Sequence, residues 1–317
     1  MRDVTFSSKF GSLASMFVNK RVAALALLLW QLALAALGGQ IVRVATFNVE
    51  NFLDVAAPTR HAKPPAAQAK VAESILALKP DVIALQEMGS TNALLSLQAR
   101  LKAGGLDLPF WNEVEASDTN IHIAVLSRFP LTELRPHTNE SFLLDGRRLP
   151  VRRGFAELAV TVNSNYQFTL ITAHLKSRVP TPEADEEEWR YQEALILRRI
   201  IDDRLAANAD EDLIALGDFN DLTDSKPIRA IAGRGKTALF DTRPAERIDG
   251  ADPARRVNWT HYYAKQDVFS RIDYIFVSKA MKRRWLKDET YALGLPDWGA
   301  ASDHRPIVAG FAAPDFK

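Results

Sequence analysis

Short apolar runs alternate along the chain with segments whose apolar residues recur at helical spacing. The continuous apolar and β-branched runs predict buried strands, at residues 41–48, 81–88, 121–130, 212–220 and 271–278. Two more runs, 153–163 and 166–177, flank a turn around Ser164 and predict a β-hairpin. A last strand is expected within 301–311, where polar residues lead into an apolar run.

Helical spacing is found in three segments, 68–78, 92–103 and 189–207. The first is stopped by Pro80, and the second is followed by Gly104 and Gly105. The third has a predicted buried stripe of Leu195, Ile196, Ile200 and Leu205. Residues 222–268 are rich in Pro, Gly, Arg and Asp and predict loops. These elements predict one α/β (α+β) domain over residues 40–317, with too many adjacent strands for a simple doubly wound sheet.

The N-terminal 39 residues differ from the rest, because they contain an apolar run from Val22 to Leu37 behind Lys20 and Arg21. This run is shorter than the roughly 20 residues of a comfortable bilayer span. It is close to the core of an export signal, about 7–15 residues. Met16 is an alternative start that would leave a compact basic leader. We expect 1–39 to be a cleaved export signal or, alternatively, a membrane anchor formed by 22–37, with a buried helix as the third interpretation.

Charge and cysteine content exclude several classes of protein. The formal net charge is +1, and residues 1–39 carry four basic side chains and one acidic one, so the remainder is about −2. A polyanion would therefore have to be bound by a local basic patch or through a metal. The chain has no cysteine, which excludes disulfides, zinc–thiolate sites and a cysteine nucleophile.

Polar side chains recur where the predicted strands end. They are Asn48 and Glu50, Glu87, His174, Asp218 and Asn220, and finally Asp303 and His304 just before the last strand. Each residue alone has an ordinary explanation, such as a cap, a turn or a core histidine. Together they form an oxygen-rich set that suits Mg²⁺, Mn²⁺ or Ca²⁺ better than zinc. The histidines beside it suit phosphate chemistry.

Seven motifs carry a resemblance to the endonuclease/exonuclease/phosphatase superfamily. They are ATFNVEN, DVIALQEM, IAVLSRFP, TAHLKS, LGDFND, RIDYIFVS and SDHRPIV, in family order from Ile41 to Phe311. The superfamily includes deoxyribonuclease I, exonuclease III, neutral sphingomyelinases and inositol polyphosphate 5-phosphatases. The resemblance implies a four-layered α/β/β/α sandwich of two mixed β-sheets flanked by helices, with the active site at one end.

The resemblance also implies a metal site. Asn48 and Glu87 are similar to the family's metal-holding pair, and Asp303 to a further metal-site acid. Glu50 stands where some relatives have a second acid, but its longer side chain departs from the usual aspartate. The implied cofactor is Mg²⁺, with Mn²⁺ or Ca²⁺ as alternatives.

The implied catalytic residues are His174, Asp218, Asn220, Asp273 and His304. Asp218 and Asn220 resemble the pair that orients the attacking water and the phosphate, and the two histidines resemble phosphate ligands. Asp273 resembles the acid that holds His304 in its working tautomer. The general base stays open between Asp218 and the His304–Asp273 pair.

The substrate is expected to be nucleic acid or another phosphodiester, and we predict an exported, monomeric, Mg²⁺-dependent nuclease. The alternatives are a phosphodiesterase or phosphatase acting on phospholipid head groups or small esters, and an inactive binding module. Lys176 and Arg152 are candidate substrate-binding residues among a basic group that includes Arg147, Arg148 and Arg153. A nuclease should have a positive groove, whereas a lipid enzyme should expose apolar loops at the rim, within 222–267.

The remaining polar and aromatic candidates have weaker signals. His122 and His261 have no predicted site role, and Asn120 is a candidate support for His174. The tryptophans are expected in packing or at the rim, at 111, 189, 259 and 298. The acidic run from Glu186 to Glu188 is expected to begin a solvated helix.

Overall fold

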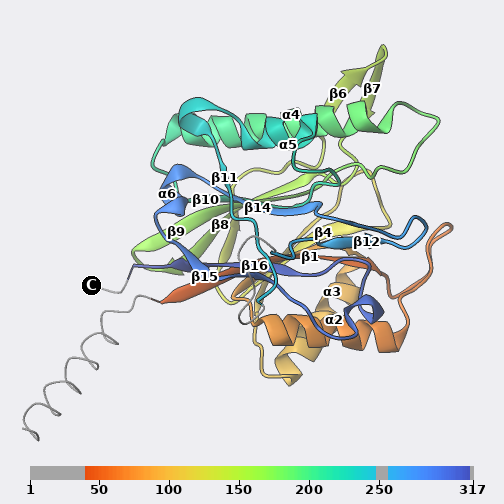
Figure 1. Ribbon diagram of the computed structural model, residues 1–317, viewed down its shortest axis with the longest axis horizontal. Coiled ribbons are helices and arrows are strands. Elements are labelled where there is room, and N and C mark those ends of the chain that lie inside the picture. The colour runs from red at the N-terminus through yellow and green to blue at the C-terminus, as the bar shows by residue number, and fades with distance from the viewer. Residues whose placement is uncertain (1–39, 248–255, 315–317) are drawn as a thin grey trace, which may run out of the picture. The chain divides into compact units, whose positions relative to one another are not determined.

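Two six-stranded β-sheets face each other at the centre of the protein (Figure 1). The computed structural model describes residues 40–247 and 256–314. The first sheet has the spatial order β15 (Trp285–Ala292), β16 (Ile307–Ala312), β1 (Ile41–Phe52), β2 (Val82–Met88), β4 (His122–Ser127) and β3 (Phe110–Val114). The second has the order β11 (Phe240–Asp241), β14 (Asp273–Val277), β10 (Leu213–Asp218), β9 (Tyr166–His174), β8 (Phe155–Asn163) and β5 (Leu131–Glu133).

Helices cover the outer face of each sheet. α2 (Pro65–Leu78) and α3 (Thr91–Ala103) pack on the first sheet, and α4 (Glu186–Ala207) and α5 (Lys226–Ala232) pack on the second (Figure 1). The predicted α/β/β/α sandwich of two mixed sheets is therefore confirmed. The smaller elements are the hairpins β6 (Ser141–Leu144) with β7 (Arg147–Pro150) and β12 (His261–Tyr263) with β13 (Val268–Ser270), the helix α6 (Lys279–Lys282), and the 3₁₀ turns η1 (Gly235–Thr237) and η3 (Trp298–Ala300).

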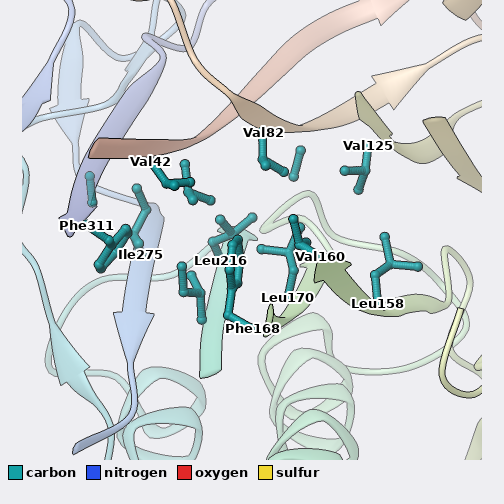
Figure 2. Close-up of a cluster of buried hydrophobic side chains, with 14 of the residues drawn as sticks. Val42, Val82, Val125, Leu158, Val160, Phe168, Leu170, Leu216, Ile275 and Phe311 are labelled. Carbon is teal, nitrogen blue, oxygen red and sulfur yellow. The ribbon is translucent and has the colours of Figure 1, made fainter. Parts of the chain in front are cut away.

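Alternation along the central strands explains the three apolar layers. In β1, Val42 and Val44 face the second sheet, whereas Ala45 and Phe47 face α2 and α3. Figure 2 shows Val42, with side chains such as Leu216 and Leu170 from the opposite sheet, in the layer between the sheets. Because these strands are buried on both faces, their sequences are continuous apolar runs, which is why they were predictable.

Two predicted details of the elements were wrong. Leu195 is 38% exposed, because it lies on the outer side of α4, while Ile196, Ile200 and Leu205 form the buried stripe. α4 begins at Glu186 rather than at 189, because Asp185 caps it by accepting a hydrogen bond from the Glu188 N–H at 2.8 Å. The separate prediction that the acidic run begins a helix is confirmed, and the helix dipole favours negative charge in this first turn.

Strands at the sheet edges were not predicted. β3 and β15 have charged and polar residues that are partly exposed, so no apolar run marks them. Strand β12 lies within the segment 222–268 that was predicted as loops, and β13 begins at the end of that segment. β1 also continues to Phe52, beyond the expected end near Asn48, through a shift in its pairing with β2.

Strand direction brings the predicted site residues to one end of the sandwich. β1 and β2 run parallel, and so do β9 and β10, so their carboxyl ends lie together. β14 and β16 run antiparallel to β10 and β1, so their first residues lie at that same end. In the second sheet, Asp218 pairs with His174 on one side and with Asp273 on the other.

The chain from Ile41 onward forms one structural unit. The predicted export signal or anchor, 1–39, lies outside the described residues. Within 40–247 and 256–314, none of the helices combines the length and the apolar character that crossing a bilayer requires.

A buried histidine bridges β8 and the loop before β6. The ring nitrogens of His137 lie 3.0 Å from Glu140 Oε1 and 2.7 Å from Glu157 Oε2. Burial acts to lower the pKa of His137, but hydrogen bonds to Glu157 and Glu140 raise it above its usual 6.5. Burial likewise acts to raise the pKa of Glu157, but His137 and Arg204 hold it below its usual 4.5. The ring is therefore a cation that donates to both carboxylates.

We expect His137→Gln to destabilise the protein by about 2–4 kcal/mol near pH 5.5, because it leaves the buried Glu157 without this cation. The contribution of His137 is complete below its unfolded pKa of 6.5 and is lost as the pH rises through the higher folded pKa. Urea unfolding of both proteins at about pH 5.5 and about pH 9 measures this. A stability difference that stays constant between the two pH values would contradict the prediction.

Candidate functional site

A cleft of about 650 Å³ opens at the end of the sandwich where the parallel strands finish. Seven of the eight residues predicted for catalysis or metal binding line it: Asn48, Glu87, His174, Asp218, Asn220, Asp303 and His304. The eighth, Asp273, lies directly behind His304. The structure thus brings together residues that are more than 250 positions apart, from both sheets.

Asn48 joins the two sheets through its carboxamide. Its Nδ2 donates to Asp218 Oδ2 at 3.0 Å and to Glu87 Oε1 at 3.4 Å. Its Oδ1 accepts the Glu50 N–H at 2.9 Å. Asn48 therefore sets the relative positions of the two carboxylates as well as contributing an oxygen to the cleft.

Several cleft residues have a left-handed backbone, which is unusual for residues other than glycine. The φ angles are 45° at Glu50, 52° at Asn51, 61° at Glu87 and 55° at Asn220. The Asn51 N–H donates to Glu87 Oε2 at 3.0 Å and so holds that side chain in place. Such strain persists only where the surroundings impose it, and it is common at functional sites.

Gly217 explains why a glycine interrupts the apolar run before Asp218. Its φ is +139°, and a Cβ at this position would lie 2.0 Å from the Ala173 carbonyl oxygen. Only glycine lets β10 approach β9 this closely, and the close approach sets Asp218 beside His174, with 3.4 Å between Oδ2 and Nε2.

Asp218 is fully buried and is held by amide donors. Its Oδ1 accepts the Asn220 N–H at 2.9 Å, and its Oδ2 accepts the Asn220 side-chain amide at 3.2 Å. Burial, with the nearby charge of Asp273, raises the pKa of Asp218 to about 6, although His304 acts in the opposite direction. The carboxylate is thus positioned in a dry environment that makes it a stronger base than an exposed aspartate.

His304 is surrounded by carboxylates. Its Nδ1 lies 2.8 Å from Asp273 Oδ2, and its Nε2 lies 3.8 Å from Asp218 and 3.9 Å from Asp303. Burial acts to lower the pKa of His304, but the charges of Asp273 and Asp218 hold it well above 6.5. His304 is therefore an imidazolium whose Nε2–H points into the cleft.

Two hydroxyl groups that the sequence analysis missed position this pair. Thr260 Oγ1 accepts the Asp273 N–H at 3.1 Å. Ser302 Oγ accepts the His304 N–H at 3.0 Å and donates to the Asn48 carbonyl at 2.7 Å. Ser302 was visible in the SDH motif, whereas no sequence signal marked Thr260.

His174 has the opposite electrostatic state. Burial, with the positive charges of Arg153 and His304, holds its pKa well below 6.5, so the ring is neutral. Its Nε2 faces Asp218 and Glu87, which places the ring proton on that nitrogen. Its Nδ1 has no hydrogen-bond partner among the described residues, so Asn120 does not support it there.

Two predicted substrate-binding residues lie outside the cleft lining. Lys176 is buried, and its Nζ donates to the carbonyls of Ser177 and Val179 at 2.9 and 2.8 Å. Arg152 pairs with Glu183 and stacks over Trp189, 4.8 Å from the ring centre. Both side chains make local contacts that the sequence did not indicate, and these contacts hold them away from the cleft lining.

Other basic residues face the cleft instead. Arg60, Arg153 and Arg178 line it. Arg153 Nη1 donates to the Leu175 carbonyl at 2.9 Å, and its Nε is buried without a hydrogen-bond partner in the part of the chain that is described. Arg153 belonged to the basic group that the sequence marked, but its orientation depends on the fold.

His261 lines the cleft although it had no predicted role. Its Nε2 lies 3.6 Å from Asp303 Oδ2, and its ring centre lies 4.6 Å from that of His304. His122, by contrast, pairs with Glu113 at 2.7 Å and does not line the cleft.

The donor atoms suit a hard divalent cation. Four carboxylates, from Glu50, Glu87, Asp218 and Asp303, line one cleft together with the Asn48 amide. Placing four carboxylates around one cleft is unfavourable unless cations offset their charge. Glu87, Asn48 and Asp303 are the residues that could hold Mg²⁺ or a similar ion, since these ions prefer oxygen ligands.

Comparisons with known proteins agree with this fold. The model of the Endonuclease/Exonuclease/phosphatase family matches residues 45–304. No curated protein matches the sequence. Three solved structures are similar in fold at low identity.

The first is a beta toxin from Staphylococcus aureus, with a TM-score of 0.60, 18% identity, and coverage of 84% of this chain and 99% of the toxin. The second is sphingomyelinase C from Streptomyces griseocarneus, with a TM-score of 0.57, 18% identity, and coverage of 86% and 99%. The third is the human nocturnin catalytic domain, with a TM-score of 0.56, 19% identity, and coverage of 86% and 94%.

The family match spans both sheets and ends at His304, so it includes every strand end that contributes to the cleft. From the fold, the clustered residues and this match together, we conclude that the chain belongs to the endonuclease/exonuclease/phosphatase family.

Proposed function

We propose that the protein is a divalent-metal-dependent phosphoesterase that hydrolyses phosphodiester bonds by in-line attack of water. The observation that carries this proposal is the position of Asp218. Its buried carboxylate is held by Asn48 from the opposite sheet, and it lies between a neutral His174 and a cationic His304. This arrangement can accept a proton from water and contact a phosphoryl group from two sides.

Each side chain has a role that follows from its protonation state. Asp218 accepts the proton of the attacking water, and the two Asn220 hydrogen bonds orient it. His304 is held cationic by Asp273, so it donates from Nε2 to a non-bridging phosphate oxygen instead of acting as the base. His174 donates from Nε2 as a neutral ring. When bound at Glu87, Asn48 and Asp303, Mg²⁺, or alternatively Mn²⁺ or Ca²⁺, would offset charge on the phosphate and the leaving oxygen.

The substrate we propose is nucleic acid. Arg60, Arg153 and Arg178 line the cleft and bring positive charge to its rim, although Arg60 lies 3.7 Å from Glu87 Oε2 and so offsets that carboxylate. Among the described residues, no carboxylate lies within ion-pair distance of Arg178, and its side chain is exposed. Guanidinium groups bind phosphates through paired hydrogen bonds, and several around one cleft favour a substrate with several phosphates.

A second candidate is a phosphodiesterase that acts on phospholipid head groups or small phosphate esters. The observation that favours it is the apolar character of part of the rim. Val179 is 61% exposed and Val268 is 45% exposed, and both line the cleft. Exposed apolar side chains beside a site are common where a lipid substrate is bound.

We further propose that the protein is exported, or anchored by residues 22–37, and acts as a monomer through the single domain 40–317. The apolar run behind Lys20 and Arg21 supports export. Membrane association through the same run is the alternative.

Parallel assays of the purified protein with Mg²⁺ test the activity and separate the two substrates. One assay uses supercoiled plasmid and the other uses bis-p-nitrophenyl phosphate. Nicking that EDTA abolishes would support the nuclease. Turnover of the small ester without nicking would reject the nuclease in favour of the second candidate, and no turnover of any phosphoester would reject the enzyme.

We expect Asp218→Asn to lower kcat by about 10²–10⁴-fold, because the amide cannot accept the proton of water. The fold should remain, since Asn keeps the size of the side chain, and circular dichroism checks this. The matched control is Asp210→Asn on the surface, where the side chain is 82% exposed. Equal activity of the Asp218 and Asp210 variants would remove Asp218 from the mechanism.

We expect Arg178→Ala to raise KM for a DNA oligonucleotide about fivefold and to reduce the salt dependence of binding by about one phosphate contact. Turnover of bis-p-nitrophenyl phosphate should not change, because this ester has no neighbouring phosphates. Arg283→Ala is the control, since Arg283 is exposed and does not line the cleft. An equal effect on both substrates would show that Arg178 does not bind the neighbouring phosphates of a polyanionic substrate.

A further inference from the structure

The β12–β13 hairpin is attached to the catalytic segment that contains Asp303 and His304. The Tyr262 N–H donates to the Asp303 carbonyl at 2.9 Å, and the Arg305 N–H donates to the Thr260 carbonyl at 2.7 Å. His261 and His304 form a β-bridge between these bonds. The backbone therefore determines where the His261 side chain lies relative to the cleft.

Three donor atoms converge at this point. His261 Nε2 lies 3.6 Å from Asp303 Oδ2, and His304 Nε2 lies 3.9 Å from Asp303 Oδ1. The three donor atoms of this group lie within 4.8 Å of one another. The distances from Asp303 to His261 and to His304, 3.6 and 3.9 Å, both exceed the roughly 2.7–3.2 Å of a hydrogen bond. Ligands about 2.0–2.2 Å from one metal ion are typically about 3.0–3.6 Å apart, so the spacing of His261 and Asp303 resembles a ligand pair.

The Asp303 side chain is accessible, whereas the His261 side chain is only 12% exposed. The Asp303 side chain is 42% exposed and lines the cleft, and its nearest hydroxyl donor, Ser302 Oγ, is 3.5 Å away. On the other side of the His261 ring, Nδ1 lies 3.5 Å from Ser270 Oγ, which leaves Nε2 directed at the cleft. His304 is not counted as a ligand, because its Nδ1 bonds to Asp273 Oδ2 at 2.8 Å and its Nε2–H donates to the phosphate in the proposed function.

We propose that His261 Nε2 and the Asp303 carboxylate form a second cation position in the cleft, with a nitrogen ligand, beside the oxygen site at Glu87 and Asn48, with which it shares Asp303. This inference rests on the proposed metal-dependent function. Water or a phosphate oxygen of the substrate completes the coordination, so the position binds more weakly than the Glu87 site. An imidazole ligand favours transition-metal ions over Mg²⁺ or Ca²⁺, so this position takes Mn²⁺ in preference to Mg²⁺.

The test uses Mn²⁺ and the full chain without substrate. Electron paramagnetic resonance titration counts the bound ions, and electron spin echo modulation detects ¹⁴N nuclei coupled to Mn²⁺. We expect about two ions per chain, one of them coupled to nitrogen. His261→Asn should remove the nitrogen modulation and weaken the second ion by about tenfold or more, while the first ion stays bound.

Two further variants keep the result interpretable. His261→Gln should also remove the nitrogen modulation and weaken the second ion, and it tests the position if His261→Asn does not fold. His122→Asn is the matched control, because His122 is a half-buried histidine that pairs with Glu113 outside the cleft, and it should leave both ions unchanged.

Nitrogen modulation that persists in His261→Asn, or one bound ion without nitrogen coupling in the unaltered protein, would overturn the second position. The latter result would make His261–Asp303 an ordinary charge pair. If no Mn²⁺ binds, or if Glu87→Gln leaves the first ion unaffected, the metal site of the proposed function fails instead. The two failures are thus distinguishable.

Discussion

The hydrogen bond from Asn48 Nδ2 to Asp218 Oδ2 connects the two sheets at the end of the sandwich. Asn48 ends the regular part of β1, and Asp218 ends β10, so this 3.0 Å contact depends on both strands finishing at the same level. The apolar layer between the sheets sets their separation, and the polar contact forms where that layer stops. The cleft, the buried carboxylate and the approach of both histidines all follow from this junction.

Charge is concentrated at the junction and is only partly offset by the protein. His304 is held positive by Asp273 and Asp218, whereas burial beside Arg153 keeps His174 neutral. The two histidines therefore have different chemistry, because Asp273 bonds directly to the His304 ring, whereas burial and the charges of Arg153 and His304 outweigh the carboxylates near His174. The carboxylates of Glu87 and Asp303, which the nearby Arg60 and His261 offset only in part, are where a divalent ion would lower the electrostatic free energy.

Precise placement in this cleft depends on unusual backbone geometry. Glu87 and Asn220 have a left-handed backbone, which is unusual for residues other than glycine, and Gly217 permits an approach that a Cβ would prevent. Each left-handed residue other than glycine costs about 1–3 kcal/mol, and the surrounding buried strands stabilise the arrangement. The apolar layers thus support the conformation on which the proposed chemistry depends.

The central strands and the strand-end residues were predictable from the amino-acid pattern, because strands buried on both faces are continuous apolar runs and polar residues stand out where they end. The layered fold was predictable only through the family resemblance that the motifs carry. Tertiary structure alone decided which side chains face the cleft. Arg152 pairs with Glu183 while its neighbour Arg153 lines the cleft, and His261 reaches Asp303 only because a hairpin folds back on His304. Edge strands such as β15 and the exposure of Leu195 were equally hidden. The hydrophobic pattern of one helix or strand indicates which of its own residues are buried, whereas these contacts join elements that are distant in the chain.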